Sequence, residues 1–139
     1  MLACLRTALL AALSLAAASL AAPPARAQSH EAYRLDMLTP GQKELLFQRV
    51  DSYAHVESFL KFCGHPPALE RRVRRTVQGC VAPASLEVIA AHFRRSLAAR
   101  AATRWNCDTD EARRMIARSE QALETAFTDL KRACERPES

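Results

Sequence analysis

Glycine and aromatic residues are scarce in this chain, and their scarcity excludes several kinds of site. Only three of the 139 residues are glycine, and 6% are aromatic. The sequence contains no glycine-rich phosphate loop and no Gly-x-Ser-x-Gly serine elbow. Its basic segments carry no interleaved aromatic residues for base stacking, so we expect no nucleic-acid partner. Because no pattern points to catalytic residues or to a cofactor, we expect a protein that is not an enzyme.

The first residues predict a secretory signal peptide. Residues 1–6 hold one basic side chain and no acidic one, and residues 7–22 are an unbroken run of Ala, Leu, Ser and Thr. Ala25-Arg26-Ala27 then supplies the small-x-small pattern that a signal peptidase requires. The apolar run is shorter than the roughly 20 residues that cross a bilayer. We expect cleavage between Ala27 and Gln28, which sends the mature chain to the bacterial periplasm or out of the cell.

The cysteine count becomes even when this leader is removed. Cys4 leaves with it, and Cys63, Cys80, Cys107 and Cys134 remain, separated by 16, 26 and 26 residues. Four cysteines in a small exported domain predict two disulfides. A structural zinc site would need closely spaced cysteine pairs, and the chain has none. The same absence of a Cys-x-x-Cys pair argues against a redox enzyme.

Apolar residues recur at three- and four-residue spacing, which predicts an all-α fold with four helices between residues 39 and 134. The first helix is expected to run from a capping box at Thr39 to about Phe62, with Gly64 as its terminator. A shorter second helix presents an apolar stripe and ends near Gly79. We expect a flexible segment over residues 28–38 and a disordered tail over residues 135–139.

The third and fourth helices are predicted from the same signals. Pro83 and Ser85 open the third helix, whose apolar stripe is expected to continue to Ala101 and Trp105. The fourth helix is expected to begin at Asp108, with a glutamate three residues later in the capping-box position. The four helices together predict a small up-and-down bundle.

The position of the cysteines at the helix ends selects a pairing. In an up-and-down bundle, Cys63 and Cys107 lie at one end, and Cys80 and Cys134 lie at the other. The second helix alone would separate Cys63 from Cys80 by about 20 Å, whereas a disulfide needs α-carbons within about 7 Å. We therefore predict the disulfides Cys63–Cys107 and Cys80–Cys134.

Three histidines are the candidates for metal chemistry. His55 and His92 border the apolar stripes of their helices, and they would converge if the first and third helices were neighbours. A small metal-binding protein or hydrolase built on this pair is one alternative function. His65 forms a Cys-x-His arrangement with Cys63, but a disulfide would consume that thiol. We expect no metal site, with His55 and His92 as hydrogen-bonded residues at the edge of the core.

Arginine is concentrated in residues 71–118, which contain eleven arginines and four acidic residues. A GC-rich gene explains such a composition without a function. The alternative is a contact surface for a partner protein, for phosphates of anionic lipids or for an acidic envelope polymer. The candidate contact residues are Arg71, Arg72, Arg74, Arg75, Arg94 and Arg95. A homodimer packed through the alanines of the third helix stays open as well.

One short segment resembles a known family. Leu38-Thr39-Pro40-Gly41-Gln42 resembles the Leu-Thr-x-x-Gln motif of small all-helical periplasmic stress chaperones and sensors. Those proteins usually show the motif twice, whereas this chain has one copy, so we do not assign it to the family. The resemblance implies a chaperone or stress-response protein as the alternative function. We expect a non-enzymatic periplasmic helical module that binds another envelope component, a protein, through its arginine-rich face.

Overall fold

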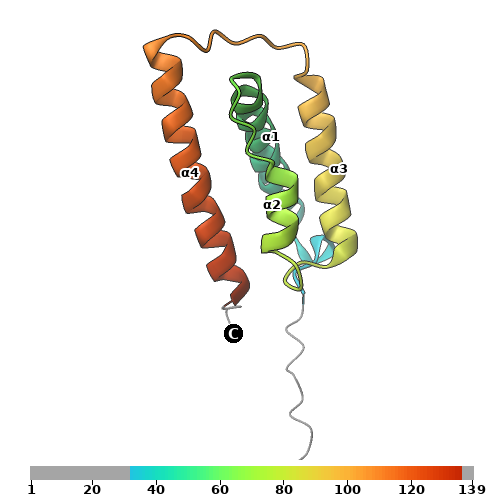
Figure 1. Ribbon diagram of the computed structural model, residues 1–139. Coiled ribbons are helices and arrows are strands. Elements are labelled where there is room, and N and C mark those ends of the chain that lie inside the picture. Colours follow the sequence, from blue (N-terminus) through green and yellow to red (C-terminus); the bar gives the residue numbers. More distant parts are fainter. Residues whose placement is uncertain (1–31, 136–139) are drawn as a thin grey trace, which may run out of the picture.

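The computed structural model of the chain describes residues 32–135 and confirms the all-α fold. A short 3-10 helix, η1 (Leu35–Met37), precedes the four helices α1 (Pro40–Phe62), α2 (Leu69–Thr76), α3 (Pro83–Ala99) and α4 (Asp110–Glu135). Consecutive helices alternate in direction, as predicted for an up-and-down bundle (Figure 1). The predicted leader and its cleavage site at Ala27–Gln28 lie outside the described residues. Within residues 32–135, no helix combines the length and the apolarity that crossing a membrane requires.

The ends of α1 follow the sequence signals. The Thr39 hydroxyl accepts a hydrogen bond from the Gln42 amide, and the Gln42 side chain accepts one from the Thr39 amide, which completes the capping box. At the other end, Gly64 has a φ of 86° and lies outside the helix. This left-handed residue turns the chain into the proline-bounded loop before α2.

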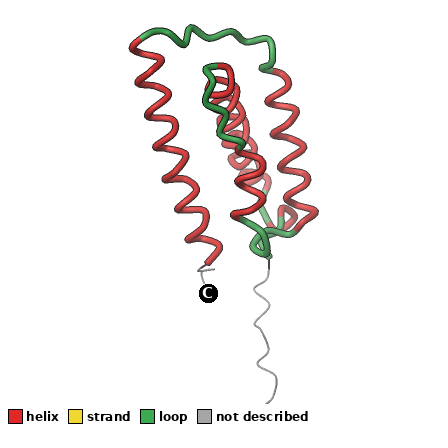
Figure 2. The backbone as a smooth tube through the Cα atoms, viewed as in Figure 1, coloured by secondary structure: helices red, strands yellow, loops and turns green. Residues whose placement is uncertain are grey.

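The third helix is shorter than predicted. It ends at Ala99, so Ala101 and Trp105 lie in the loop of residues 100–109 that leads to α4 (Figure 2). Near this end the Arg100 guanidinium donates to the Ser96 carbonyl at 2.7 Å and so satisfies one of the last carbonyls of the helix. Trp105 then packs edge-on against Phe59 of α1, with ring centroids 5.2 Å apart. The apolar stripe therefore continues through a folded-back loop, not through more helix.

The start of the fourth helix also differs from the prediction. The Thr109 hydroxyl accepts from the amide of Ala112 at 3.1 Å, so Thr109 is the capping residue and the helix begins at Asp110. Asp108 precedes the cap, and Glu111 lies in the first turn, where a negative charge suits the helix dipole. No capping box forms because the third helical position holds alanine.

Residues 32–38, which the sequence placed in a flexible segment, dock on the turn between α2 and α3. The Tyr33 amide donates to the Cys80 carbonyl at 2.8 Å, and the Ala82 amide donates to the Tyr33 carbonyl at 2.9 Å. Two residues after Tyr33, the Leu35 amide donates to the Ser85 hydroxyl, also at 2.9 Å. Ser85 therefore does not cap α3, whose first turn begins with Pro83 after Ala82.

One apolar cluster joins all four helices. The extensive packing of α1 against α3 forms its main part, while α2 contacts both α3 and α4. Its buried members are Val50, Ala54, Phe59, Leu60, Leu69, Phe93, Ile116 and Leu123. Leu60 is completely buried. The core thus lies along the middle of α1 and is covered by α4 through two large side chains, Ile116 and Leu123.

Both predicted disulfides are present. Cys63–Cys107 and Cys80–Cys134 have α-carbons 5.5 and 5.4 Å apart, respectively. Cys63–Cys107 joins the end of α1 to the loop before α4. Cys80–Cys134 joins the turn after α2 to the last turn of α4. Two disulfides in so small a domain are consistent with an oxidising compartment outside the cytoplasm.

We predict that Leu60→Ala lowers the free energy of unfolding by about 2–5 kcal/mol, because the substitution leaves a cavity in the centre of the core. Urea unfolding followed by circular dichroism at constant pH measures this change. Leu45→Ala on the same helix is the matched control, since the Leu45 side chain is 62% exposed. The control should change the free energy of unfolding by less than about 0.5 kcal/mol. Equal effects of both substitutions would contradict this description of the core.

Candidate functional site

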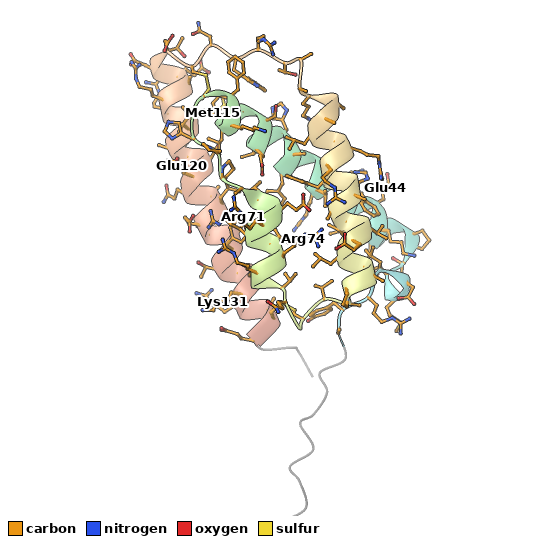
Figure 3. All side chains as sticks on the ribbon, turned by 45° about the vertical axis from the view of Figure 1, so that its right-hand side comes forward. Glu44, Arg71, Arg74, Met115, Glu120 and Lys131 are labelled. Carbon is orange, nitrogen blue, oxygen red and sulfur yellow. A yellow bond between two sulfur atoms is a disulfide. The ribbon has the colours of Figure 1, made fainter. Side chains whose placement is uncertain are left out.

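The six candidate arginines lie on the neighbouring helices α2 and α3. Arg71, Arg72, Arg74 and Arg75 follow one another on α2, and Arg94 and Arg95 lie on α3. The apolar side of α2 faces the interior, with Leu69 almost completely buried. Because one turn of helix holds fewer than four residues, the four arginines cannot share one side, and the structure gives them different environments. Figure 3 labels two of them, Arg71 and Arg74.

Two of the arginines belong to an ion-pair network between α2 and α3. Glu70 accepts from Arg74 at 3.0 Å and from Arg94 at 2.6 Å. Arg74 also reaches across to Glu87 at the start of α3. Two guanidinium groups and two carboxylates thus form a network that is neutral overall. We call these four residues, Glu70, Arg74, Glu87 and Arg94, the α2–α3 network.

This network shifts the pKa values of Arg74 and Glu87. The hydrogen bond from Arg74 lowers the pKa of the Glu87 carboxyl, and the nearby Arg94 charge acts in the same sense. Hydrogen bonds to Glu87 and Glu70 raise the pKa of Arg74. Arg74 and Glu87 therefore stay ionised at neutral pH, and their ion pair links α2 to α3.

Arg72 has a structural role on the opposite side of α2. Its guanidinium pairs with Glu124 of α4 at 2.8 Å and lies 4.1 Å from the centroid of the Phe127 ring. A guanidinium over an aromatic face is held by a cation–π attraction as well as by the ion pair. Arg72 is thus occupied by α4.

Three candidate arginines remain without an ion-pair partner in the described part of the chain. Arg71 and Arg75 lie on the exposed side of α2, and Arg95 is exposed on α3, next to Arg94 of the network. We call Arg71, Arg75 and Arg95 the arginine surface. Since the adjacent network is neutral, these residues leave three uncompensated positive charges, two on α2 and one on the neighbouring helix α3.

His55 and His92 have different partners, although α1 and α3 are neighbours. His92 Nε2 lies 2.9 Å from a carboxylate oxygen of Asp51, and its ring packs on Phe47 with centroids 4.6 Å apart. The His55 ring instead packs edge-on against Trp105, with centroids 5.1 Å apart. Each histidine thus serves in packing, and neither gathers further metal ligands.

His65 lies in a pocket between the loop before α2 and helix α4. The pocket has a volume of about 320 Å³, and its walls include Pro66, Pro67 and Leu123. His65 Nδ1 lies 3.1 Å from a carboxylate oxygen of Glu120, whose position on α4 is labelled in Figure 3. The sulfur of Cys63 is bonded to Cys107, so the Cys-x-His arrangement has no thiol to offer a metal. Among residues 32–135, no group of three or more His, Cys, Asp or Glu could hold a metal ion.

Several contacts of this region carry no signal in the sequence. Glu57 of α1 accepts a hydrogen bond from the Leu69 amide at 2.8 Å and so satisfies the first turn of α2 from another helix. The preceding residue is Ala68, whose methyl group has no acceptor, so its own side chain cannot act as the cap. A cap supplied from twelve residues away cannot be recognised by local spacing.

Comparison of the chain with protein-family models, with curated proteins and with solved structures finds no match. The function is therefore argued from the residues and their geometry.

We predict that the pair of Asp51 and His92 contributes a pH-dependent part of the stability. Hydrogen bonds from Ser96 and then from His92 lower the pKa of the Asp51 carboxyl below 3.8. A lowered pKa in the folded state stabilises the fold above the pKa of the unfolded chain, and this contribution is lost as the pH falls through the lowered value. Asp51→Asn should therefore destabilise the protein at pH 7, and its stability should converge with that of the wild type below pH 3.8.

Urea unfolding at a series of pH values tests this expectation. Glu44→Gln is the control, because a glutamine at this exposed position still accepts the hydrogen bond from Gln48. A constant difference between Asp51→Asn and wild type from pH 7 to the acid limit would contradict the proposed role of Asp51.

Proposed function

We propose that the mature protein is a non-enzymatic helical binding module that is periplasmic or secreted. It contacts an acidic protein of the cell envelope through the arginine surface. The observation that carries the proposal is the separation of the arginines into paired and unpaired groups. Arg72, Arg74 and Arg94 are occupied within the chain, whereas Arg71, Arg75 and Arg95 are exposed and have no ion-pair partner in the described residues.

The location of the arginine surface favours binding. The α2–α3 network and the cap from Glu57 hold the backbone of α2 in place before any partner arrives. Binding then requires ordering of the three side chains but not of the helices, which reduces its entropic cost. A guanidinium presents a planar set of donors that matches a carboxylate in two parallel hydrogen bonds. Three such groups favour a partner that displays several carboxylates.

A protein partner fits this surface better than a membrane does. A helix that lies in a membrane interface needs an apolar side exposed to the lipid. The large apolar residues of α2 face the core, and none of them is exposed. The α2 part of the arginine surface therefore offers charge and hydrogen-bond donors without an apolar anchor for lipid, and on α3 Val88 is the one large apolar side chain that is exposed.

The signal sequence and the disulfides support an envelope location for this binding. Residues 1–27 show the pattern of a cleaved leader, and the two disulfides suit an oxidising compartment. Removing Arg6 and Arg26 with the leader leaves 18 basic residues against 15 acidic ones. Because this excess is small, the local grouping of charge matters more than the net charge.

We predict that the triple variant Arg71→Gln, Arg75→Gln, Arg95→Gln loses about tenfold in affinity for its envelope partner, since each exposed charge pair contributes up to about 1 kcal/mol. Affinity capture of the mature protein from envelope extract identifies the partner, and titration of the purified partner against both proteins measures the change. Raising the salt concentration should weaken wild-type binding more than binding of the variant.

The matched control removes the same amount of charge elsewhere. Arg49, Arg114 and Arg118 are also exposed and without an ion-pair partner in the described residues, but they lie on α1 and α4. Changing these three to Gln should leave the affinity within about twofold of the wild type, because they lie outside the proposed contact surface. An equal loss in both triple variants would show that only net charge matters. Binding of the wild type to anionic vesicles, with no protein captured, would favour a lipid partner and contradict the proposal.

A further inference from the structure

Both disulfides attach the same C-terminal part of the chain to the remainder. We call residues 32–99 the body and residues 100–135 the C-terminal arm, which consists of the long loop and α4. Cys107 in the loop is joined to Cys63 at the end of α1, and Cys134 near the end of α4 is joined to Cys80 after α2. No disulfide connects two parts of the body. The arm is thus bonded to the body at two points, in its loop and near its C-terminal end.

The body is held together by contacts that do not involve the arm. Helices α1 and α3 pack closely, and the contact of His92 with Asp51 and Phe47 lies at their interface. The bond from the Leu69 amide to Glu57 and the burial of the Leu69 side chain attach α2 to α1, while the α2–α3 network, whose side chains are 30–60% exposed, adds a weaker link to α3. Backbone hydrogen bonds also attach the Tyr33 segment to the turn between α2 and α3.

The arm has fewer noncovalent contacts for its length. Helix α4 spans 26 residues, and only Ala112, Ile116 and Leu123 are buried. Two ion pairs join it to the body within residues 32–135, His65–Glu120 and Arg72–Glu124, and their acidic side chains are 52% and 69% exposed. Ion pairs so exposed to water contribute little to stability. The two disulfides are therefore the strongest attachments of the arm.

The arm covers an apolar part of the body. Ile116 and Leu123 belong to the same buried cluster as Phe59, Leu60 and Leu69. Trp105 in the loop packs over Phe59 and His55 from the adjoining side. Figure 1 shows α4 along one side of the bundle, connected to α3 only by the loop. Removal of the arm would expose the Phe59 and Leu60 side of α1 to water.

We propose that the C-terminal arm is a cover locked by Cys63–Cys107 and Cys80–Cys134, and that reduction of both disulfides by a dithiol releases it and exposes the apolar surface beneath. One dithiol reduces one disulfide. Its first thiolate attacks one cysteine sulfur and expels the other cysteine as a thiolate, which leaves a mixed disulfide. Its second thiolate then attacks the dithiol's own sulfur in the mixed disulfide and expels the remaining cysteine as a thiolate. Two electrons and two protons pass to the cysteine pair, and the dithiol becomes a cyclic disulfide.

The effect of reduction follows from what each disulfide joins. Both bonds link the arm to the body, across 44 and 54 residues of sequence. When both are open and the body stays folded, the conformational entropy gained is that of the arm, residues 100–135. Because the packing of α1 against α3 does not involve the arm, we expect the arm to open before the body unfolds. The inference does not depend on the proposed function, because the arginine surface lies on the body.

Hydrogen exchange of the reduced protein tests the proposal. The mature chain is treated with dithiothreitol until four thiols can be titrated, and amide exchange is compared with that of the oxidised protein. Protection in α4 should fall by about a hundredfold, while protection in α1 and α3 should change by less than about threefold. Fluorescence of an apolar dye should rise at the same time, and a protease should cut the loop of residues 100–109.

Single-disulfide variants provide the matched controls. Cys63→Ser with Cys107→Ser should raise exchange mainly in the first half of α4, whereas Cys80→Ser with Cys134→Ser should raise it mainly in the second half. The triple arginine variant should open on reduction as the wild type does, which separates this proposal from the proposed function. Unchanged protection in α4 after all four thiols are titrated would overturn the proposal. Equal loss of protection in every helix would overturn it as well, because it would show that the chain unfolds as one unit.

Discussion

Covalent attachment at two opposite ends determines where α4 can lie, and the covering of the apolar core depends on that position. Cys63–Cys107 holds the loop before α4 over the end of α1, and Cys80–Cys134 holds the far end of α4 beside the turn after α2. Between these points, Ile116 and Leu123 complete the cluster that surrounds Leu60. A chain of this size buries a limited apolar core, so covalent links compensate for contacts that a larger domain would supply.

The four arginines of α2 lie on different sides of this short helix. Arg72 faces α4, Arg74 faces α3, and Arg71 and Arg75 lie on the side between them, exposed to water. The same residue type therefore fastens the helix to two neighbours and presents free positive charge outward. This division separates the arginines that the fold requires from those available to a partner.

The histidines and aromatic residues have mainly structural roles. His92 packs on Phe47 at the interface of α1 and α3, while Trp105 of the loop packs against His55 and Phe59. Each ring is placed by packing on another ring, and no set of metal ligands forms among residues 32–135. These rings therefore belong to the packing of the bundle, whose apolar interior is covered by the C-terminal arm.

The sequence by itself determined the helices, the bundle and the disulfide pairing. Helical periodicity, the Thr39 capping box and the terminating glycines act within a few residues, and the lengths of the helices between the cysteines exclude the other pairings. Only the tertiary structure decided which arginines are free, where Trp105 lies and how residues 32–38 dock. These outcomes depend on side chains brought together from distant parts of the chain, as Glu87 is brought to Arg74 and Glu124 to Arg72. Local spacing carries no information about such partners, because their distance is set by how the helices pack.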